Sequence, residues 1–301
     1  MSEKNSSVVV VDGLRTFFQQ NQRLVRAVDD VSFSIPEEGL FGLAGESGSG
    51  KTQTALAISG LVQGTPGVIE GDIWVDGTNI LSGLESFCSV QHEGGGVQIR
   101  KDISRWRKHR ERRMETIRGS VVSMVFQEPK GSLSPYFTVG EQARETVSVH
   151  FGASAADTYQ ERVHPLLEQM GFRDPGRVLD SYPHELSGGQ CQRVMLALSL
   201  VSDPDLLIAD EPTTLLDAIT EERVLELFGA LVREQDLALL LITHDLGVMT
   251  RLVDRVAIMQ KGTVVEQGTV SEIMDGALAD RHSHTRELRR AAERTGVLVR
   301  E

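Results

Sequence analysis

The 301-residue chain contains only two cysteines, Cys88 and Cys191, which give neither a disulfide framework nor the spacing of a cysteine metal site. We expect both to be reduced thiols of a cytosolic protein. Residues Met1–Asn5 lack the basic and then apolar order of a signal peptide. No stretch approaches the roughly 18 consecutive apolar residues that a membrane-spanning helix needs. Any membrane role is therefore expected to come through a partner.

Positive charge is also scarce, because 31 Lys and Arg face 43 Asp and Glu, which leaves a net charge of −12. This balance argues against nucleic-acid binding by the whole surface. The exception is the basic segment Arg100–Arg118, in which basic residues outnumber acidic ones. We favour a solvated helix there, and the alternative is a contact with anionic lipid headgroups or an acidic partner loop. The length favours two domains or one large one.

One motif stands out against this background. Gly45–Thr52 reads Gly-Glu-Ser-Gly-Ser-Gly-Lys-Thr, between an apolar strand-like run and a helix-like run. Glycines let the backbone N–H groups of such a loop converge on an anion, and the following helix adds its positive end. Lys51 would reach the β- and γ-phosphates of a nucleotide, and Thr52 would offer its hydroxyl to Mg²⁺. We call Gly45–Thr52 the phosphate loop.

Short apolar or β-branched runs predict strands. The predicted strands are Val8–Val11, Val31–Ile35, Leu40–Ala44, Val68–Val75, Val121–Phe126, Asp205–Asp210, Leu237–Thr243, Arg255–Met259 and Thr263–Glu266. The predicted helices are Thr54–Leu61, Val139–Phe151, Asp157–Met170, Ser187–Val201, Ile219–Arg233 and Ser271–Glu301. We expect a loop over Pro129–Pro135 and a flexible break over Gly94–Gly96. Strands that alternate with helices predict a largely parallel α/β core.

Polar residues follow several of these strands, where open α/β sheets bind ligands. Asp210 fits as an acidic partner of nucleotide-bound Mg²⁺, and Glu211 as the base that takes a proton from water. Gln127 can touch Mg²⁺ and orient water, and His244 can hydrogen-bond a γ-phosphate. Each alone would be interpreted as structural. Their places beside a phosphate loop favour a functional interpretation.

Leu186–Gln190, here called the serine–glycine turn, is the most specific of the remaining signals. Ser-Gly-Gly at a helix N-terminus is a second anion-binding device. A single nucleotide does not need two such surfaces in one chain. We therefore expect two chains to face head to tail, with each nucleotide between one chain's phosphate loop and the other's serine–glycine turn.

These motifs, in this order, resemble the ATP-binding cassette (ABC) ATPases. The matching motifs are the Walker A loop Gly45–Thr52, the Q-loop Gln127, the signature Leu186–Gln190, Walker B Leu206–Asp210 with Glu211, the D-loop Thr214–Asp217 and the switch His244. The resemblance implies ATP and Mg²⁺ as ligands, with Glu211, His244 and Gln127 catalytic and Thr52, Gln127 and Asp210 on the metal. It implies nucleotide contacts from Gly45, Glu46, Ser47, Gly48, Ser49, Gly50, Lys51, Thr52, Ser187, Gly188, Gly189, Gln190 and Asp217.

Finer features are similar to the oligopeptide, dipeptide and nickel importer ATPases. The sequence Lys51–Thr54 is similar to their D-type subunit, which pairs with a different F-type ATPase. The usual His-Pro-Tyr-Thr appears as His282–Thr285, and the C-terminal cysteine cluster of many relatives is missing, so no iron–sulfur cluster is expected.

The resemblance implies an α/β P-loop NTPase (RecA-like) core with an antiparallel β subdomain and an inserted α-helical subdomain. The expected ATPase domain is 1–270, with the helical subdomain at about 128–200 and a C-terminal helical extension at 271–301. Such a subunit would power import of peptides or related small solutes from the cytoplasmic face of the membrane. Its implied partners are a second ATPase subunit, two membrane permease subunits and an extracytoplasmic solute-binding protein.

The alternative is a soluble cassette ATPase that acts on nucleic acid or ribosomes. Such relatives usually have two cassettes, long coiled-coil insertions or zinc-binding cysteines, and only the basic segment favours this alternative. The sequence leaves the cargo open among peptide, nickel, opine and sugar. It also leaves open whether Phe17 or Phe18 stacks on adenine or packs into a sheet.

Overall fold

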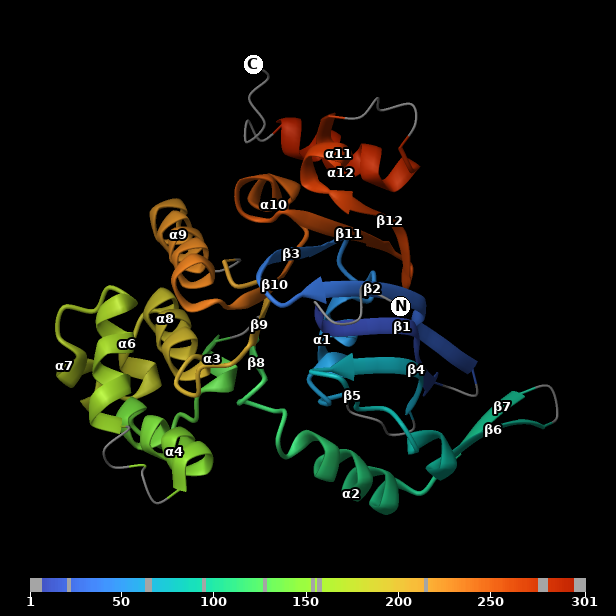
Figure 1. Cartoon of the computed structure of the whole chain (residues 1–301), viewed down its shortest axis with the longest axis horizontal. Coiled ribbons are helices and arrows are strands. Elements are labelled where there is room, and N and C mark those ends of the chain that lie inside the picture. Colours follow the sequence, from blue (N-terminus) through green and yellow to red (C-terminus); the bar gives the residue numbers. More distant parts are fainter. Residues whose placement is uncertain are drawn as a thin grey trace. The chain divides into compact units, whose positions relative to one another are not determined.

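The structure is a computed structural model that describes residues 7–20, 23–62, 67–93, 96–126, 129–152, 155, 159–213, 216–275 and 281–294. Figure 1 shows its helices and strands, coloured along the sequence. The chain divides into two compact units. Unit 1 comprises Met1–Arg118 and Leu240–Glu301, and unit 2 comprises Gly119–Leu239. Unit 2 is thus one continuous segment between two parts of unit 1. Among the described residues, no helix is long and apolar enough to cross a membrane.

Unit 1 begins with β-structure and ends with helices. Its first part holds β1 (Ser7–Gln20), β2 (Arg23–Pro36), β3 (Gly39–Ala44), α1 (Lys51–Ile58), β4 (Gly67–Val75), β5 (Thr78–Asn79), η1 (Leu84–Phe87), β6 (Cys88–Glu93), β7 (Gly96–Lys101) and α2 (Ile103–Met114). Its second part holds α10 (Leu246–Leu252), β11 (Arg255–Gln260), β12 (Thr263–Thr269), α11 (Val270–Asp275) and α12 (Ser283–Arg294). The strand β10 (Ala238–Thr243) contains the point of division.

A four-stranded antiparallel sheet in the order β2-β1-β4-β5 confirms the predicted antiparallel subdomain. Strands β1 and β2 are longer than predicted, because register shifts let their pairing continue past Val11. Phe17 lies inside β1, is 7% exposed and contacts Val68 and Ile99. Phe17 therefore packs into the protein, and Phe18 is half-buried.

The strand that leads to the phosphate loop is β3. It pairs in parallel with β11, with Phe41 opposite Arg255 and Ala44 opposite Ile258, and its other neighbour is β10. Strands β11 and β12 form the predicted hairpin. Both residues of its turn, Lys261 and Gly262, have positive φ, as a two-residue type I′ turn requires.

Helix α1 begins within the phosphate loop, earlier than predicted, and ends earlier as well. Its end is set by Gly60, which has φ of 63°. Leu61 N donates to Leu56 O at 2.7 Å and Gly60 N to Ala57 O at 3.1 Å. This pair of bonds is a Schellman motif, which closes a helix at a glycine.

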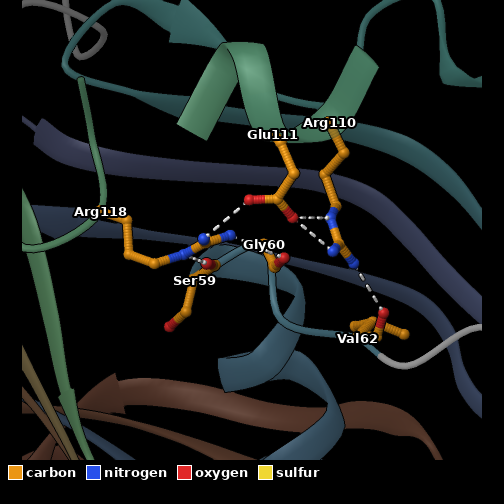
Figure 2. Close-up of polar contacts among 6 residues, drawn as sticks. All are labelled: Ser59, Gly60, Val62, Arg110, Glu111 and Arg118. Atoms are coloured by element: carbon orange, nitrogen blue, oxygen red, sulfur yellow. Dashed lines mark hydrogen bonds and ion pairs between the residues drawn. The ribbon is translucent and has the colours of Figure 1, made fainter. Parts of the chain in front are cut away.

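Most of the basic segment lies in α2, and only one face of α2 is the solvated helix that we predicted. Trp106 and Met114 are buried on the other face. Arg118 donates to Ser59 O at 3.4 Å and to Gly60 O at 3.2 Å, and Arg110 donates to Val62 O at 3.1 Å (Figure 2). These cations satisfy carbonyl groups at and beyond the C-terminus of α1, where positive charge is favourable.

The hairpin β6–β7 was not predicted from the sequence. Cys88 pairs with Lys101 and Glu93 with Gly96. Gly96 therefore lies in a strand, and the predicted break is wrong at this residue, since backbone pairing with β6 supplies the order that glycine lacks by itself. Gly94 and Gly95 lie outside the described residues.

Unit 2 is mainly helical. It holds β8 (Val122–Val125), α3 (Pro129–Ser132), α4 (Val139–Phe151), η3 (Tyr159–Val163), α6 (His164–Gln169), α7 (Pro175–Asp180), η4 (Pro183–Glu185), α8 (Gly188–Ser199), β9 (Leu206–Asp210) and α9 (Ala218–Gln235). Strands β8 and β9 are parallel. The predicted bounds of α4 are confirmed, and Thr138 and Glu141 form a capping box at its start. The loop predicted over Pro129–Pro135 is wrong at its start, where Pro129 suits the first turn of a helix.

The Arg110–Glu111–Arg118 cluster predicts a pH-dependent stability. Burial raises the pKa of Glu111, but the hydrogen bonds from both arginines outweigh it and leave the pKa below its ordinary value. Glu111→Gln should therefore lower the unfolding free energy above pH ~4.3 by at most about 1 kcal/mol, since the carboxylate is partly exposed. The difference should disappear as the pH falls through the lowered pKa. Urea unfolding at several pH values measures it.

The matched control is Glu115→Gln, which removes the same charge one turn further along the chain, at an exposed position. We expect no such pH-dependent loss from this variant. Equal behaviour of the two variants would contradict the role given to the cluster.

Candidate functional site

The backbone of the phosphate loop is held in conformations that only glycine adopts readily. Gly45, Gly48 and Gly50 have φ of 152°, 79° and 107°. A Cβ at Gly45 would lie 2.3 Å from Met259 O, and one at Gly50 would lie 2.5 Å from Ala27 O. A Cβ at Gly48 would meet nothing within 4 Å. The loop is thus packed against its own unit on one side and has room at Gly48.

The charged and hydroxyl groups of the loop fit an anion. Lys51 is buried, and its Nζ donates to Gly45 O at 2.6 Å and to Glu46 O at 2.9 Å. The ammonium is thus fixed inside the loop. Ser49 Oγ is buried and accepts or donates no hydrogen bond within the described part of the chain. A buried hydroxyl of this kind needs a polar partner, and a phosphate oxygen would supply one.

Neighbouring elements of unit 1 support the loop. Gly262 N, in the β11–β12 turn, donates to Ser49 O at 2.9 Å. Gly262 O in turn accepts from Asp29 N at 2.8 Å. The sequence predicted the β11–β12 turn but gave no sign of this contact, because it joins residues far apart in the chain.

Two further predicted residues of unit 1 are exposed. Thr52 is the second residue of α1, where its hydroxyl is accessible to a metal ion. His244 follows β10, the neighbour of β3, and is exposed just before the residue that caps α10, Asp245. The sequence therefore placed His244 correctly at a strand end.

In unit 2, the parallel register sets Val125 opposite Ala209, so β8 and β9 end at the same edge. Asp210 follows Ala209 and is 2% exposed. Glu211 is partly exposed and has φ of 47°. A glutamate in this left-handed region is strained, and such strain is typical of functional sites. Gln127, predicted beside them, lies outside the described residues.

The serine–glycine turn begins α8 as predicted. Ser187 Oγ accepts from Gln190 N at 3.2 Å, and Gln190 Oε1 accepts from Ser187 N at 2.8 Å. This capping box orders the first turn of the helix. A Cβ at Gly188 would meet nothing within 4 Å, so the backbone there can be approached closely. The first N–H groups of a helix have no partner within it and suit an anion.

The start of α9 lies against this turn. A Cβ at Gly189 would be 3.2 Å from Leu216 and 3.5 Å from Thr220. Asp217 caps α9, because its Oδ1 accepts from Thr220 N at 3.0 Å. This backbone bond, with the bond from the Thr220 hydroxyl, lowers the pKa of Asp217. Two helix starts therefore lie together in unit 2, while Thr214 and Leu215 lie outside the described residues.

A family model described as "ABC transporter" matches residues 28–214, which include the phosphate loop, Asp210 and the serine–glycine turn. The chain therefore belongs to the ABC transporter family, and the nucleotide-binding cassette is the class that its fold and motifs define.

Its relatives include the oligopeptide transport ATP-binding protein AppD of Bacillus subtilis, 39% identical over 89% of this chain and 74% of that protein. The glutathione import ATP-binding protein GsiA of Shigella dysenteriae is 36% identical over 97% of this chain. The chain spans only 43% of GsiA's length.

Solved structures support the fold. The chain is similar to a dimeric, post-hydrolysis structure of the ATP-binding cassette MJ0796 bound to ADP and Pi, with a TM-score of 0.68 at 24% identity over 87% of this chain and 98% of that one. It is also similar to cbiO1 from Clostridium perfringens, part of the complex cbiONQ, with a TM-score of 0.67 at 22% identity over 90% of this chain and 92% of that one. The predicted P-loop NTPase fold is thereby confirmed.

The packing of the phosphate loop predicts that its glycines differ in their tolerance of a side chain. Gly48→Ala should cost about 1–2 kcal/mol, because only the left-handed backbone is strained. Gly45→Ala should cost about 1–3 kcal/mol more, because its Cβ also meets a backbone oxygen. Urea unfolding of the nucleotide-free protein measures both variants. Equal losses would show that the contact with Met259 O does not restrain the loop.

Proposed function

We propose that this chain is an ATP-binding and ATP-hydrolysing subunit of an ABC importer at the cytoplasmic face of the membrane. The observation that carries the proposal is the presence in one chain of two different anion-binding backbones. One is the phosphate loop with its internal ammonium, and the other is the capped glycine start of α8. Membership of the ABC transporter family supports it.

The proposed chemistry is hydrolysis of the γ-phosphate of ATP. Lys51 and the loop N–H groups bind the β- and γ-phosphates. Thr52, Asp210 and Gln127 would hold Mg²⁺, which would supply charge neutralisation at the phosphates. Glu211 takes a proton from the attacking water, and His244 hydrogen-bonds the γ-phosphate. Gly45–Ser49 contact the nucleotide as part of the loop.

We further propose that each phosphate loop works with the serine–glycine turn and Asp217 of a second ATPase subunit. The support is that one nucleotide needs only one phosphate loop, while the backbone at Gly188 is open to an approaching ligand. The second subunit is proposed to be an F-type chain, and this chain the D-type. The other proposed partners are two membrane permease subunits and an extracytoplasmic solute-binding protein.

We propose peptides or related small solutes as the cargo. The support is that two relatives are named for oligopeptide transport and glutathione import. Action on nucleic acid is not proposed. In the basic segment that favoured it, Arg110 and Arg118 donate hydrogen bonds to backbone carbonyl groups of unit 1.

Replacing the proposed base tests the chemistry. Glu211→Gln should lower the ATPase rate by about 10²–10⁴-fold while ATP still binds, since the amide cannot accept the proton. Lys51→Ala should instead lose tight ATP binding. Steady-state hydrolysis by the assembled transporter and equilibrium titration with labelled ATP measure the two effects. Glu226→Gln, at an exposed position of α9, is the control. Undiminished hydrolysis in Glu211→Gln would remove Glu211 as the base.

Enlarging the serine–glycine turn tests the shared site. Ser187→Arg should reduce hydrolysis at the partner's phosphate loop, because the side chain would occupy the space of the γ-phosphate. Ser187→Thr keeps the capping hydroxyl and serves as the matched control. ATP binding to this chain's own phosphate loop should persist in both variants. Unchanged activity of Ser187→Arg in the assembled complex would count against a shared site.

A further inference from the structure

His284, near the start of α12, faces two carboxylates within unit 1. Its Nδ1 atom lies 3.9 Å from Glu46 Oε1 of the phosphate loop and 3.9 Å from Glu287 Oε2, one turn along α12. One donor atom from each of the three residues lies within 4.8 Å of the others. An imidazole and two carboxylates therefore converge from two segments that are distant in the sequence.

The histidine is poorly satisfied by the protein alone. Its side chain is 0% exposed, and neither ring nitrogen has a hydrogen-bond partner among the residues that the structure describes. The 3.9 Å separations are too long for hydrogen bonds. Buried polar groups of this kind normally have a partner, so an unpartnered ring directed at two carboxylates points to a missing ligand.

The donor set indicates the chemistry of that ligand. Imidazole nitrogen with carboxylate oxygen suits zinc and similar divalent ions, whereas Mg²⁺ and Ca²⁺ prefer oxygen alone. We propose that Glu46, His284 and Glu287 bind one zinc-class divalent cation that joins α12 to the phosphate loop. Water would complete the tetrahedral coordination.

The three ligand atoms must close around the ion. Ligand atoms about 2.0–2.1 Å from zinc are about 3.4 Å apart in a tetrahedron. Each carboxylate must therefore approach His284 Nδ1 by about 0.5 Å, and the two carboxylate oxygens, which lie within 4.8 Å of one another, must also come to about this separation. The side chains of Glu46 and Glu287 are 66% and 65% exposed, so both can adjust while the buried imidazole stays in place.

This cation would act on the phosphate loop through Glu46. The carbonyl oxygen of Glu46 accepts a hydrogen bond from Lys51 Nζ at 2.9 Å, while its side chain faces α12. Holding the Glu46 side chain therefore restrains a residue that positions the Lys51 ammonium. Without a cation, the same three groups would form an ion pair only if His284 were protonated.

The test is a titration of the nucleotide-free, full-length protein with Zn²⁺ at pH 7 in the presence of a competing chelator. Calorimetry measures the number of Zn²⁺ ions bound and their affinity. We expect one equivalent to bind, and Mg²⁺ not to displace it. His284→Gln and Glu287→Gln should each weaken binding more than about tenfold, since even the outer partners of metal ligands contribute that much. Co²⁺ in place of Zn²⁺ should give the absorption of a tetrahedral ion, which reports the coordination independently of ATPase activity.

Matched controls come from unit 2. His164→Gln and Glu226→Gln change the same residue types at positions that are not part of the cluster, and both variants should bind Zn²⁺ as the unaltered protein does. Glu287 is exposed, so Glu287→Gln tests the site even where His284→Gln fails to fold. The proposal is overturned if the unaltered protein binds no Zn²⁺ or if Glu287→Gln binds it equally well.

Discussion

The close packing of the phosphate loop against the carbonyl oxygens of Ala27 and Met259 is the constraint on which the rest depends. It leaves no room for a side chain at Gly50 or Gly45 and holds both in left-handed backbone conformations. The loop therefore takes its shape from the strands around it and does not have to be ordered by its ligand. This fixed backbone holds the Lys51 ammonium through Gly45 O and Glu46 O. Preorganised donors of this kind bind a phosphate with little ordering cost.

In unit 2, local contacts likewise order the serine–glycine turn. The capping box of Ser187 and Gln190 fixes the start of α8, and the start of α9 lies against Gly189. Glu211 follows the buried strand β9 in a strained conformation. Local hydrogen bonds thus order the serine–glycine turn without using the open side of Gly188. This arrangement is what the proposed docking of a second subunit's nucleotide requires.

Local patterns in the sequence predicted the phosphate loop and the serine–glycine turn. The features that the sequence did not predict depend mainly on contacts between distant segments. Ser187 predicted the start of α8, and Gly45–Thr52 predicted the phosphate loop that leads into α1, because both signals are read within a few residues. The β6–β7 hairpin was missed because its pairing overrides the flexible composition at Gly96. The bonds from Arg118 to the end of α1 and the approach of His284 to Glu46 join distant segments, so periodicity gives no sign of them. The positive φ of Glu211 has no signal in the residue type.

The central claim is that the phosphate loop is completed by the serine–glycine turn of another ATPase subunit. The most direct measurement places a photoactivated cross-linking residue at Ser47, which is exposed in the loop, and identifies its adduct in the assembled transporter by mass spectrometry. The account predicts an adduct that depends on ATP and Mg²⁺ and joins Ser47 to the corresponding turn of a neighbouring ATPase subunit. An adduct with Leu186–Gln190 of the same chain, or one that forms equally without nucleotide, would contradict it.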